Sequence, residues 1–272
     1  MDFTEKLNGA VERNRSLVCV GLDPDPKRMP EGISVAYFNR AIVDATSDLV
    51  CAYKPNLAFY EALGKEGQEA LRQTLRHIPA DIPVIADAKR SDIGNTAAAY
   101  ARAIFEDLGF DACTVNPYLG GDSVEPFASY RDRGVFILCR TSNPGAADFQ
   151  DLRCRHGGKS LPLYQIVALR AAEWNTHGNI GLVVGATYPG ELGIIRKQHP
   201  DMLFLIPGVG AQGGDAAQVV RQGASVEGRG IIINSSRQVL YASQGKDFDT
   251  AARTAAEALR DEINRHLSAL PA

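Results

Sequence analysis

The amino-acid sequence predicts a single (β/α)₈ barrel of the TIM type, and three observations favour this fold. The chain has 272 residues, close to the ~250 residues that are typical of such barrels. Eight short apolar runs alternate with longer segments of helical periodicity, a pattern typical of parallel strands joined by helices. Polar and charged side chains gather where the apolar runs end, which is where barrels of this kind build their sites.

The expected strands and helices follow one another in order along the chain. The strand candidates are Leu17–Leu22, Leu49–Lys54, Val84–Lys89, Ala112–Val115, Val135–Arg140, Ile180–Gly185, Leu203–Pro207 and Gly230–Ile233. The helix candidates are Val35–Ser47, Gly67–Arg76, Thr96–Leu108, Leu161–Asn175, Glu191–Gln198, Asp215–Gln222 and Phe248–Leu267. No linker rich in Pro, Gly or Ser divides the chain, so residues 1–272 are expected to form one domain. The longest irregular segment, Thr141–Ser160, is expected to form a long loop, and such loops often act as lids.

A doubly wound open sheet is the alternative fold with the same alternation of strands and helices. That fold normally places a GxGxxG fingerprint directly after its first strand. The first strand candidate here leads into Gly21-Leu-Asp-Pro-Asp-Pro26, which does not match the fingerprint. The barrel is therefore favoured.

Composition excludes several classes of partner. The chain has 29 basic and 32 acidic residues, a net charge of −3, so it has no overall positive field to attract nucleic acid or an anionic membrane. The N-terminal residues lack a signal-peptide core, and no apolar run approaches the ~20 residues that span a bilayer. We expect a cytoplasmic protein with no nucleic-acid or membrane partner.

The cysteines and histidines do not predict a metal site. Five cysteines are present, an odd number without CxxC spacing, which is typical of small buried side chains in a reducing compartment. The five histidines lie in helical or loop segments, away from most of the predicted strand ends. Surface histidines are the simpler interpretation, and no metal is expected.

The most informative segment is Asp87-Ala-Lys-Arg-Ser-Asp92, at the end of a short apolar run. Side chains alternate along a strand, so Asp87 and Lys89 should face the same side. Another lysine, Lys54, ends an earlier strand. Charges at the mouth of an apolar strand are costly to desolvate unless they pair. We therefore predict an alternating network of Lys54, Asp87, Lys89 and Asp92 that carries chemistry. A structural salt-bridge network at the barrel rim is the alternative.

A second signal follows the seventh strand, in Pro207-Gly-Val-Gly-Ala-Gln-Gly-Gly214. Glycine-rich turns before a helix can bind phosphate through their backbone N–H groups, and barrels often bind phosphate after strands seven and eight. Arg237, just after the eighth strand, could grip a phosphate in bidentate fashion, with Gln212 as a further donor. The alternative is that the glycines only form a tight turn.

These residues resemble the orotidine 5′-phosphate decarboxylase family. Asp87-Ala-Lys-Arg-Ser-Asp-Ile-Gly-Asn-Thr96 is similar to the family motif D-x-K-x-x-D-I-x-x-T, in the wording of the longer, bacterial type 2 branch. Further matches, which together span residues 18 to 240, are Cys19–Asp25, Tyr53–Asn56, Val184–Pro189 and Pro207–Gly214. The resemblance implies conversion of orotidine 5′-monophosphate to uridine 5′-monophosphate and CO₂, the last step of de novo pyrimidine synthesis, without cofactor or metal.

The resemblance also implies roles for individual residues. Asp87 would lie against the substrate carboxylate, and Lys89 would stabilise and protonate the C6 carbanion. Lys54 and Asp92 would complete the network, with Asp92 and Thr96 reaching into the site of a second subunit of a homodimer. The substrate-binding residues would be Asp23, Asn56, Thr96, Ser142, Pro207, Gly208, Gln212, Gly213 and Arg237. Asp23 and Asn56 could instead serve as a turn residue or a helix N-cap.

Two points limit the resemblance. Many family members have Gly-Arg at the phosphate position after strand eight, whereas this chain has Ser235-Ser-Arg237. Arg229 is a second candidate, but it precedes the strand and should lie at the opposite end of the barrel. The segment Thr141–Ser160 is hard to align, which makes the role of Ser142 less specific than that of the charged residues.

Two other functions are compatible with parts of the pattern. A Mg²⁺-dependent sugar-phosphate decarboxylase or aldolase of the same superfamily shares D-x-K-x-x-D but places a glutamate ligand at the end of strand two. This chain has Lys54 there, and an ammonium repels Mg²⁺. A phosphate-ligand binder without catalysis is the other alternative, which the complete charged set disfavours.

Overall fold

The protein is described by a computed structural model that covers residues 1–210, 213–225 and 227–270, and it confirms the predicted barrel. Eight parallel strands follow one another in the order β2-β1-β10-β9-β8-β5-β4-β3. Isolated parallel bridges from Tyr53 to Val84 and from Asn56 to Asp87 join β2 to β3 and complete the circle. The barrel strands are β1 (Val18–Leu22), β2 (Ala52–Pro55), β3 (Ile85–Arg90), β4 (Ala112–Val115), β5 (Gly134–Arg140), β8 (Ile180–Val184), β9 (Phe204–Pro207) and β10 (Ile231–Ser235).

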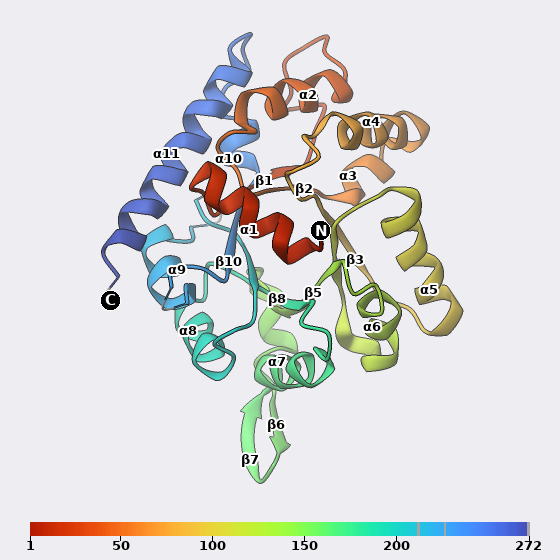
Figure 1. Ribbon diagram of the computed structural model, residues 1–272, viewed down its shortest axis with the longest axis vertical. Helices are drawn as coiled ribbons and strands as arrows, with labels where there is room; N and C mark the ends of the chain where they lie inside the picture. Colours follow the sequence, from red (N-terminus) through yellow and green to blue (C-terminus); the bar gives the residue numbers. More distant parts are fainter. Residues whose placement is uncertain (211–212, 226, 271–272) are drawn as a thin grey trace.

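Helices lie around the outside of this barrel and across one of its ends (Figure 1). They are α1 (Phe3–Asn14), α2 (Val35–Thr46), α3 (Leu57–Glu61), α4 (Gly64–His77), α5 (Gly94–Arg102), α6 (Gly121–Ala128), α7 (Leu163–Trp174), α8 (Pro189–Gln198), α9 (Ala216–Gly223), α10 (Arg237–Leu240) and α11 (Phe248–Ser268). Short turns are η1 (Ala103–Asp107), η2 (Pro117–Leu119) and η3 (Pro144–Asp148). Within the described ranges, no helix is both long and apolar enough to cross a membrane.

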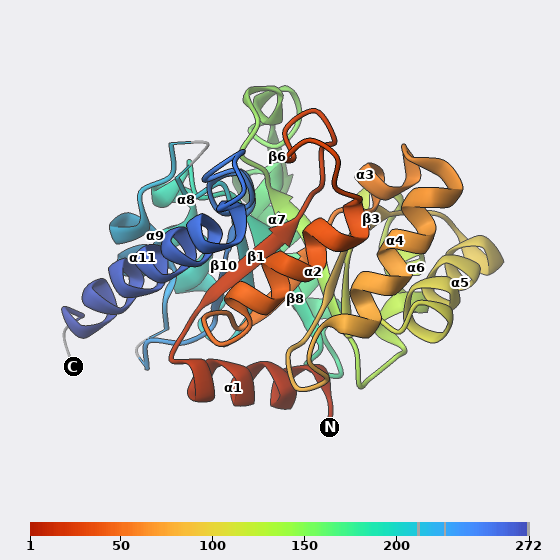
Figure 2. The ribbon, with the colours of Figure 1, turned by 90° about the horizontal axis from the view of Figure 1, so that it is seen from above.

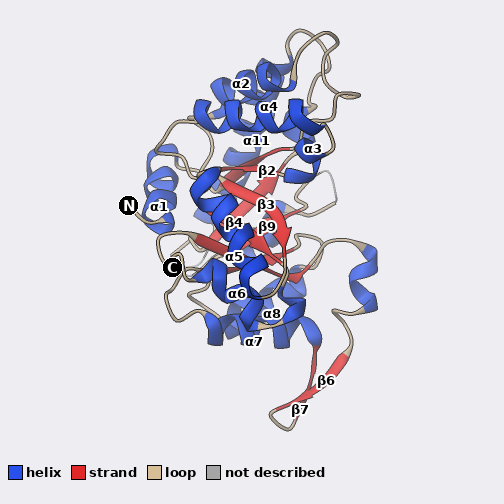
Figure 3. Ribbon diagram, turned by 90° about the vertical axis from the view of Figure 1, so that its right-hand side faces the viewer, coloured by secondary structure: helices blue, strands red, loops and turns tan. Residues whose placement is uncertain are grey.

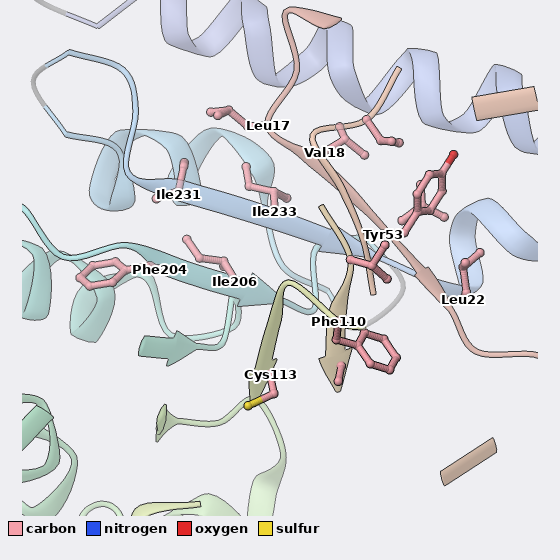
Figure 4. Close-up of a cluster of buried hydrophobic side chains, with 14 of the residues drawn as sticks. Leu17, Val18, Leu22, Tyr53, Phe110, Cys113, Phe204, Ile206, Ile231 and Ile233 are labelled. Atoms are coloured by element: carbon pink, nitrogen blue, oxygen red, sulfur yellow. The ribbon is translucent and has the colours of Figure 1, made fainter. Parts of the chain in front are cut away.

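The larger apolar core lies between the strands and the helices. Alternate strand residues such as Val18, Tyr53, Phe204 and Ile233 point outward and are buried under the helices (Figure 4). Because a parallel barrel is covered on both faces, its strands are apolar almost throughout. This is why the sequence shows continuous apolar runs at these positions.

A second, smaller core fills the inside of the barrel, and α1 closes its lower end (Figure 2). The Phe3 ring packs edge-on against Phe136 of β5, with ring centroids 5.8 Å apart. Gly134 makes room, since a Cβ there would approach Phe3 to 2.5 Å. Lys6 of α1 forms an ion pair with Asp111 at 2.8 Å. The opposite end of the barrel, where the strands end, stays open.

The segment after β5 differs from the expected irregular loop. It contains η3 and an antiparallel hairpin of β6 (Arg153–His156) and β7 (Lys159–Pro162), which projects away from the barrel (Figure 3). The expected helix from Leu161 begins only at Leu163, because the preceding residues pair within the hairpin. In the expected helix Thr96–Leu108, regular α-helix ends at Arg102 and a wider π-type turn continues to Asp107.

Four of the five cysteines are buried, as predicted, whereas Cys154 in the β6–β7 hairpin is only partly buried. All five are free thiols, and three of the buried ones, Cys19, Cys113 and Cys139, lie in barrel strands. Burial raises the pKa of the Cys19 and Cys139 thiols to about 12, so both stay protonated at neutral pH and are poor nucleophiles.

Candidate active site

The open end of the barrel holds a cavity of about 730 Å³. Leu138, Val183 and Leu205 line it from inside the barrel, and polar side chains surround them. Nine residues predicted from the sequence line this cavity: Asp23, Lys54, Asn56, Asp87, Lys89, Ser142, Pro207, Gly208 and Arg237. The cavity therefore combines an apolar floor with convergent polar groups, as small-molecule sites generally do.

Three of the four predicted charges form one network. The Lys54 ammonium donates to Asp87 Oδ2 at 2.7 Å, and the Lys89 ammonium donates to Asp87 Oδ1. The Lys54 and Asp87 side chains are only 4% and 12% exposed, whereas Lys89 is 49% exposed. The inner pair is thus fixed within the protein, while the outer ammonium faces the cavity.

Burial and charge act in opposite directions on this pair. Burial alone would raise the pKa of Asp87, but the charges of Lys54 and Lys89 outweigh it and hold that pKa well below its usual range. Burial would lower the pKa of Lys54, but the charges of Asp87 and Asp23 raise it above its usual value. The buried pair is therefore ionised at neutral pH.

Asp92 and Thr96 do not join this network within one chain. Asp92 follows β3, and its carboxylate accepts the N–H of Ile93 at 2.8 Å. Thr96 lies exposed in the first turn of α5. Neither residue is part of the cavity lining. The structure of one chain therefore does not bring these two predicted residues into the site.

The glycine-rich turn after β9 is held in part by its own backbone hydrogen bonds. The N–H of Gly210 donates to Gly214 O, that of Gly213 to Gly210 O, and that of Gly214 to Gly208 O. These three amides are thus engaged within the turn itself. The predicted donor Gln212 lies outside the described residues, and Gly213 does not line the cavity. At the start of the following helix, the Asp215 side chain caps α9 by accepting the N–H of Ala217.

Two arginines stand at this side of the cavity. Arg237 opens α10, and Arg28, in the loop after β1, was not predicted; both line the main cavity and a second, shallower hollow beside it. Neither guanidinium forms an ion pair with a carboxylate of the described residues. Arg229 lies at the other end of the barrel, as expected, where it pairs with Glu12 of α1 at 3.1 Å.

The Arg28 loop is tied to α10 through Tyr241. The Tyr241 hydroxyl donates to Asp23 O at 2.9 Å and accepts the N–H of Asp25 at 2.6 Å. The Arg28 guanidinium lies over the Tyr241 ring, 4.2 Å from its centroid. These contacts hold Arg28 on the same side of the cavity as Arg237.

Asp23 and Asn56 have distinct surroundings. Asp23 Oδ1 is buried and accepts no hydrogen bond from the described residues, which leaves it available for a hydroxyl of a ligand. Asn56 caps α3 by accepting the N–H of Ala58 at 3.2 Å, and its backbone pairs with Asp87 where the barrel closes. Asn56 therefore has the structural role considered for it and also lines the cavity.

Ser142 lies on a segment that is firmly held. Gln150 accepts the N–H of Thr141 at 2.9 Å and donates to its hydroxyl at 2.8 Å. The buried Arg140 donates to Gln150 and to Asp151, and it stacks 3.8 Å from the Tyr188 ring centroid. The first residues of the long segment after β5 are thus positioned at the cavity rather than loose.

The comparisons with known proteins agree with this geometry. The sequence model described as "Orotidine 5'-phosphate decarboxylase / HUMPS family" matches residues 16–252. The chain belongs to this family. It is 54% identical over 266 residues to the orotidine 5′-phosphate decarboxylase of Dehalococcoides mccartyi (strain CBDB1), covering 98% of each chain. Its identity to the Roseiflexus sp. (strain RS-1) enzyme of that name is also 54%, over 99% of this chain and 100% of the relative.

Solved structures show the same family fold. The chain resembles Leishmania donovani UMP synthase with a TM-score of 0.89 and 43% identity, over 100% of this chain and 58% of that one. It resembles Leishmania donovani OMP decarboxylase with a TM-score of 0.86 and 40% identity, over 99% and 100% of the two chains. The match to only part of the UMP synthase chain shows that this fold also occurs within a longer protein.

Several cavity residues of this family member escaped the sequence prediction. Thr114 and Asn234 are polar residues inside apolar strands. Each lies two positions after a residue that faces the inside of the barrel, Ala112 or Ile232, so the alternation of side chains along a strand could have revealed them. Asn143 follows Ser142 directly. Arg28 lies six residues beyond the end of β1, in the middle of a loop, and gives no sequence signal. Among the described residues, no group of three or more His, Cys, Asp or Glu side chains could hold a metal ion.

The buried ion pair predicts a pH dependence of stability. Because the pKa of Asp87 is lowered in the folded state, its contribution is present above the unfolded value of about 3.9 and is lost as the pH falls through the acid range. At pH 7, Asp87→Asn should lower the free energy of unfolding by roughly 3 kcal/mol, since Lys54 stays buried without its anion. Urea unfolding from about pH 7 to pH 3 should show that the difference in unfolding free energy between wild type and Asp87→Asn becomes smaller below about pH 5.

Asp201→Asn is a matched control, because Asp201 is exposed and precedes β9 at the other end of the barrel. It should change the unfolding free energy little at any pH. A gap between wild type and Asp87→Asn that is constant from neutral to acid pH would contradict the buried, ionised pair.

Proposed function

We propose that this chain decarboxylates orotidine 5′-monophosphate to uridine 5′-monophosphate and CO₂, the last step of de novo pyrimidine synthesis, without metal or organic cofactor. The observation that carries the proposal is the Lys89 ammonium, held at the mouth of the cavity by the ionised Lys54–Asp87 pair. Family membership and the names of relatives above 50% identity support it. We further propose the type 2 branch and a cytoplasmic location.

The reaction needs a fixed cation beside C6. Loss of CO₂ leaves an electron pair in an sp² orbital that the pyrimidine ring cannot delocalise, so the carbanion is strongly basic. An ammonium that is already in place stabilises this charge as it develops and costs no reorganisation. Lys89 then donates a proton to C6 as the general acid. The ion pair with Asp87 holds the Lys89 ammonium in position for this step.

Asp87 has two effects in this proposal. It holds both lysines, and in the complex it lies against the substrate carboxylate, which raises the energy of the bound ground state. We assign the larger share of the rate to the preorganised Lys89 cation. Lys54 keeps Asp87 ionised and fixed, so that the anion cannot turn away from the incoming carboxylate.

Other cavity residues bind the nucleotide. Ser142, on its anchored segment, reads the edge of the pyrimidine. The unpartnered oxygen of Asp23 accepts a hydrogen bond from a ribose hydroxyl, with Asn56 beside it. Arg237 and Arg28 hold the phosphate dianion next to Pro207 and Gly208. Gln212 and Gly213 remain sequence-based candidates for the same group.

A homodimer would complete each site. Asp92 and Thr96 are the residues of the family motif that lie outside the cavity of their own chain, and we propose that they enter the cavity of a partner. Exposed apolar side chains support a contact here: Ile93 is 57% exposed next to Asp92, and Tyr118 is 81% exposed after the neighbouring strand β4. Such side chains are suited to burial against a second copy.

The two alternative functions are less well supported. A Mg²⁺-dependent relative would need a carboxylate where Lys54 stands, and this ammonium is committed to Asp87. A binder without catalysis would have no use for a desolvated charge network, which is costly to maintain.

Replacing Lys89 tests the reaction and its acid together. Lys89→Ala should lower kcat for orotidine 5′-monophosphate by at least about 1000-fold, since it removes both the cation and the proton donor. Conversion is followed by the ultraviolet change. Lys197→Ala, an exposed lysine at the end of α8, should keep wild-type activity, as should wild type in excess EDTA. No conversion by wild type would refute the activity, and loss in EDTA would refute metal independence.

If Arg28 and Arg237 bind the phosphate, replacing either one should reduce kcat/KM only for a substrate that carries a phosphate. Arg28→Gln and Arg237→Gln should each lower kcat/KM by roughly 10- to 100-fold, because each removes a charged hydrogen bond to the dianion. With orotidine, which has no phosphate, both variants should equal wild type. Lys27→Gln, an exposed neighbour of Arg28, is the control. An equal loss with both substrates would argue against phosphate binding by these arginines.

Mixing two inactive variants tests the shared site. Lys89→Ala and Asp92→Ala dimers should each be nearly inactive. After subunit exchange, each heterodimer has one site with Lys89 from one chain and Asp92 from the other, so about a quarter of wild-type activity should return. Absence of recovery despite proven exchange would show that each site is built within a single chain.

A further inference from the structure

The end of β3 departs from regular pairing where it carries the catalytic charges. Ala86 pairs with Cys113 of β4, and the next pair is Arg90 with Val115. Asp87, Ala88 and Lys89 therefore lie together opposite a single residue, Thr114. Bulges of this kind re-aim side chains and are common beside active sites.

The backbone of Lys89 has an unusual conformation at this bulge. Its φ is +47°, in the left-handed region that residues with a Cβ rarely adopt. The other non-glycine residue of the described chain with positive φ is Arg15, where the left-handed conformation ends α1 in an ordinary C-cap. Lys89 lies in a strand and ends no helix, so the contacts of its neighbours must hold its backbone in this conformation.

The Thr114 hydroxyl holds the bulge with three hydrogen bonds. Its oxygen accepts the N–H of Ala88 at 3.0 Å and the N–H of Lys89 at 2.9 Å. Its proton is donated to Asp87 Oδ1 at 3.2 Å. A hydroxyl has two acceptor positions and one donor, so Thr114 uses its full capacity on these three consecutive residues. The side chain is only 2% exposed and borders the cavity.

These bonds also orient the Asp87 carboxylate. Oδ1 accepts from both Thr114 and Lys89, while Oδ2 accepts from Lys54. Thr114 thus turns one carboxylate oxygen toward each lysine. The same hydroxyl fixes the backbone from which Lys89 extends, so it governs both the base of the lysine side chain and the anion that holds its tip.

We infer that Thr114 is a positioning residue for decarboxylation, acting through its hydroxyl to place the Lys89 ammonium. The inference rests on the proposed role of Lys89. Without the hydroxyl, the N–H groups of Ala88 and Lys89 lose their acceptor and the left-handed turn loses its support. The ammonium then leaves its catalytic position, and a misplacement of about 1 Å can cost about 100-fold in rate.

Thr114→Val tests this directly, because valine keeps the shape of threonine and lacks its hydroxyl. The variant should lower kcat by about 100-fold, with KM close to wild type because no group that binds the substrate is removed. Thr114→Ser, which keeps the hydroxyl, should retain most of kcat. Each enzyme is assayed well below its own Tm, so that only folded protein is compared.

Thr74→Val is the matched control for loss of a buried hydroxyl. Thr74 lies in α4, accepts from Asn39 and donates to Ala70 O, and is remote from the cavity. It should lower Tm and leave kcat unchanged. If Thr114→Val shows the same pattern, its hydroxyl serves stability alone and the inference is wrong. The inference also fails if Thr114→Ser loses as much kcat as Thr114→Val.

Two further variants keep the test decisive. If Thr114→Val does not fold, Thr114→Ser and Thr114→Ala provide a comparison that differs by one oxygen atom. Failure of both hydroxyl-free variants to fold would overturn the inference, since the fold itself would require the oxygen. Lys89→Ala in the same assay separates the two proposals. A wild-type kcat there would refute the role of Lys89. A loss there, without one in Thr114→Val, would refute only the role of Thr114.

Discussion

The buried ion pair between Lys54 and Asp87 is the interaction on which the site depends. Two opposite charges at the inner end of a cavity are tolerated because each compensates the desolvation of the other. The pair joins β2 to β3 where the barrel closes through single bridges rather than a continuous ladder. The same contact therefore closes the barrel and fixes the anion that holds Lys89, and neither can be altered independently.

The rest of the site is arranged around that anchor by different means. The segment that carries Ser142 is held by side-chain hydrogen bonds from Gln150 and by the stacked, buried Arg140. The turn after β9 uses its own amides for its fold. In the proposed function, recognition of the phosphate then depends on the long side chains of Arg28 and Arg237. Rigid groups thus surround the reacting end of the cavity, and more adaptable groups surround the remote end.

The sequence predicted the barrel and most of the site because both depend on local patterns. Apolar runs reveal strands that are covered on both faces, and charges at strand ends reveal where parallel strands converge. The helix α1 was missed, although its capping box of Asp2 and Glu5 is visible in the sequence. The β6–β7 hairpin was missed because its exposed strands lack an apolar face. The bulge at Lys89 could not be foreseen, because the register depends on how β3 pairs with β4. The local sequence of β3 does not give that pairing.

Because α1 closes the lower end of the barrel, its position affects the order in which the chain folds. Its apolar side faces Phe136, and its lysine pairs with Asp111, residues that are synthesised more than a hundred positions later. The helix cannot dock until β4 and β5 have emerged from the ribosome, so its apolar face stays unprotected for the first half of translation. Contacts of such long sequence separation slow folding, and exposed apolar surface in the meantime favours aggregation. The docking of α1 at the end of the barrel farthest from the cavity therefore affects folding and aggregation rather than catalysis.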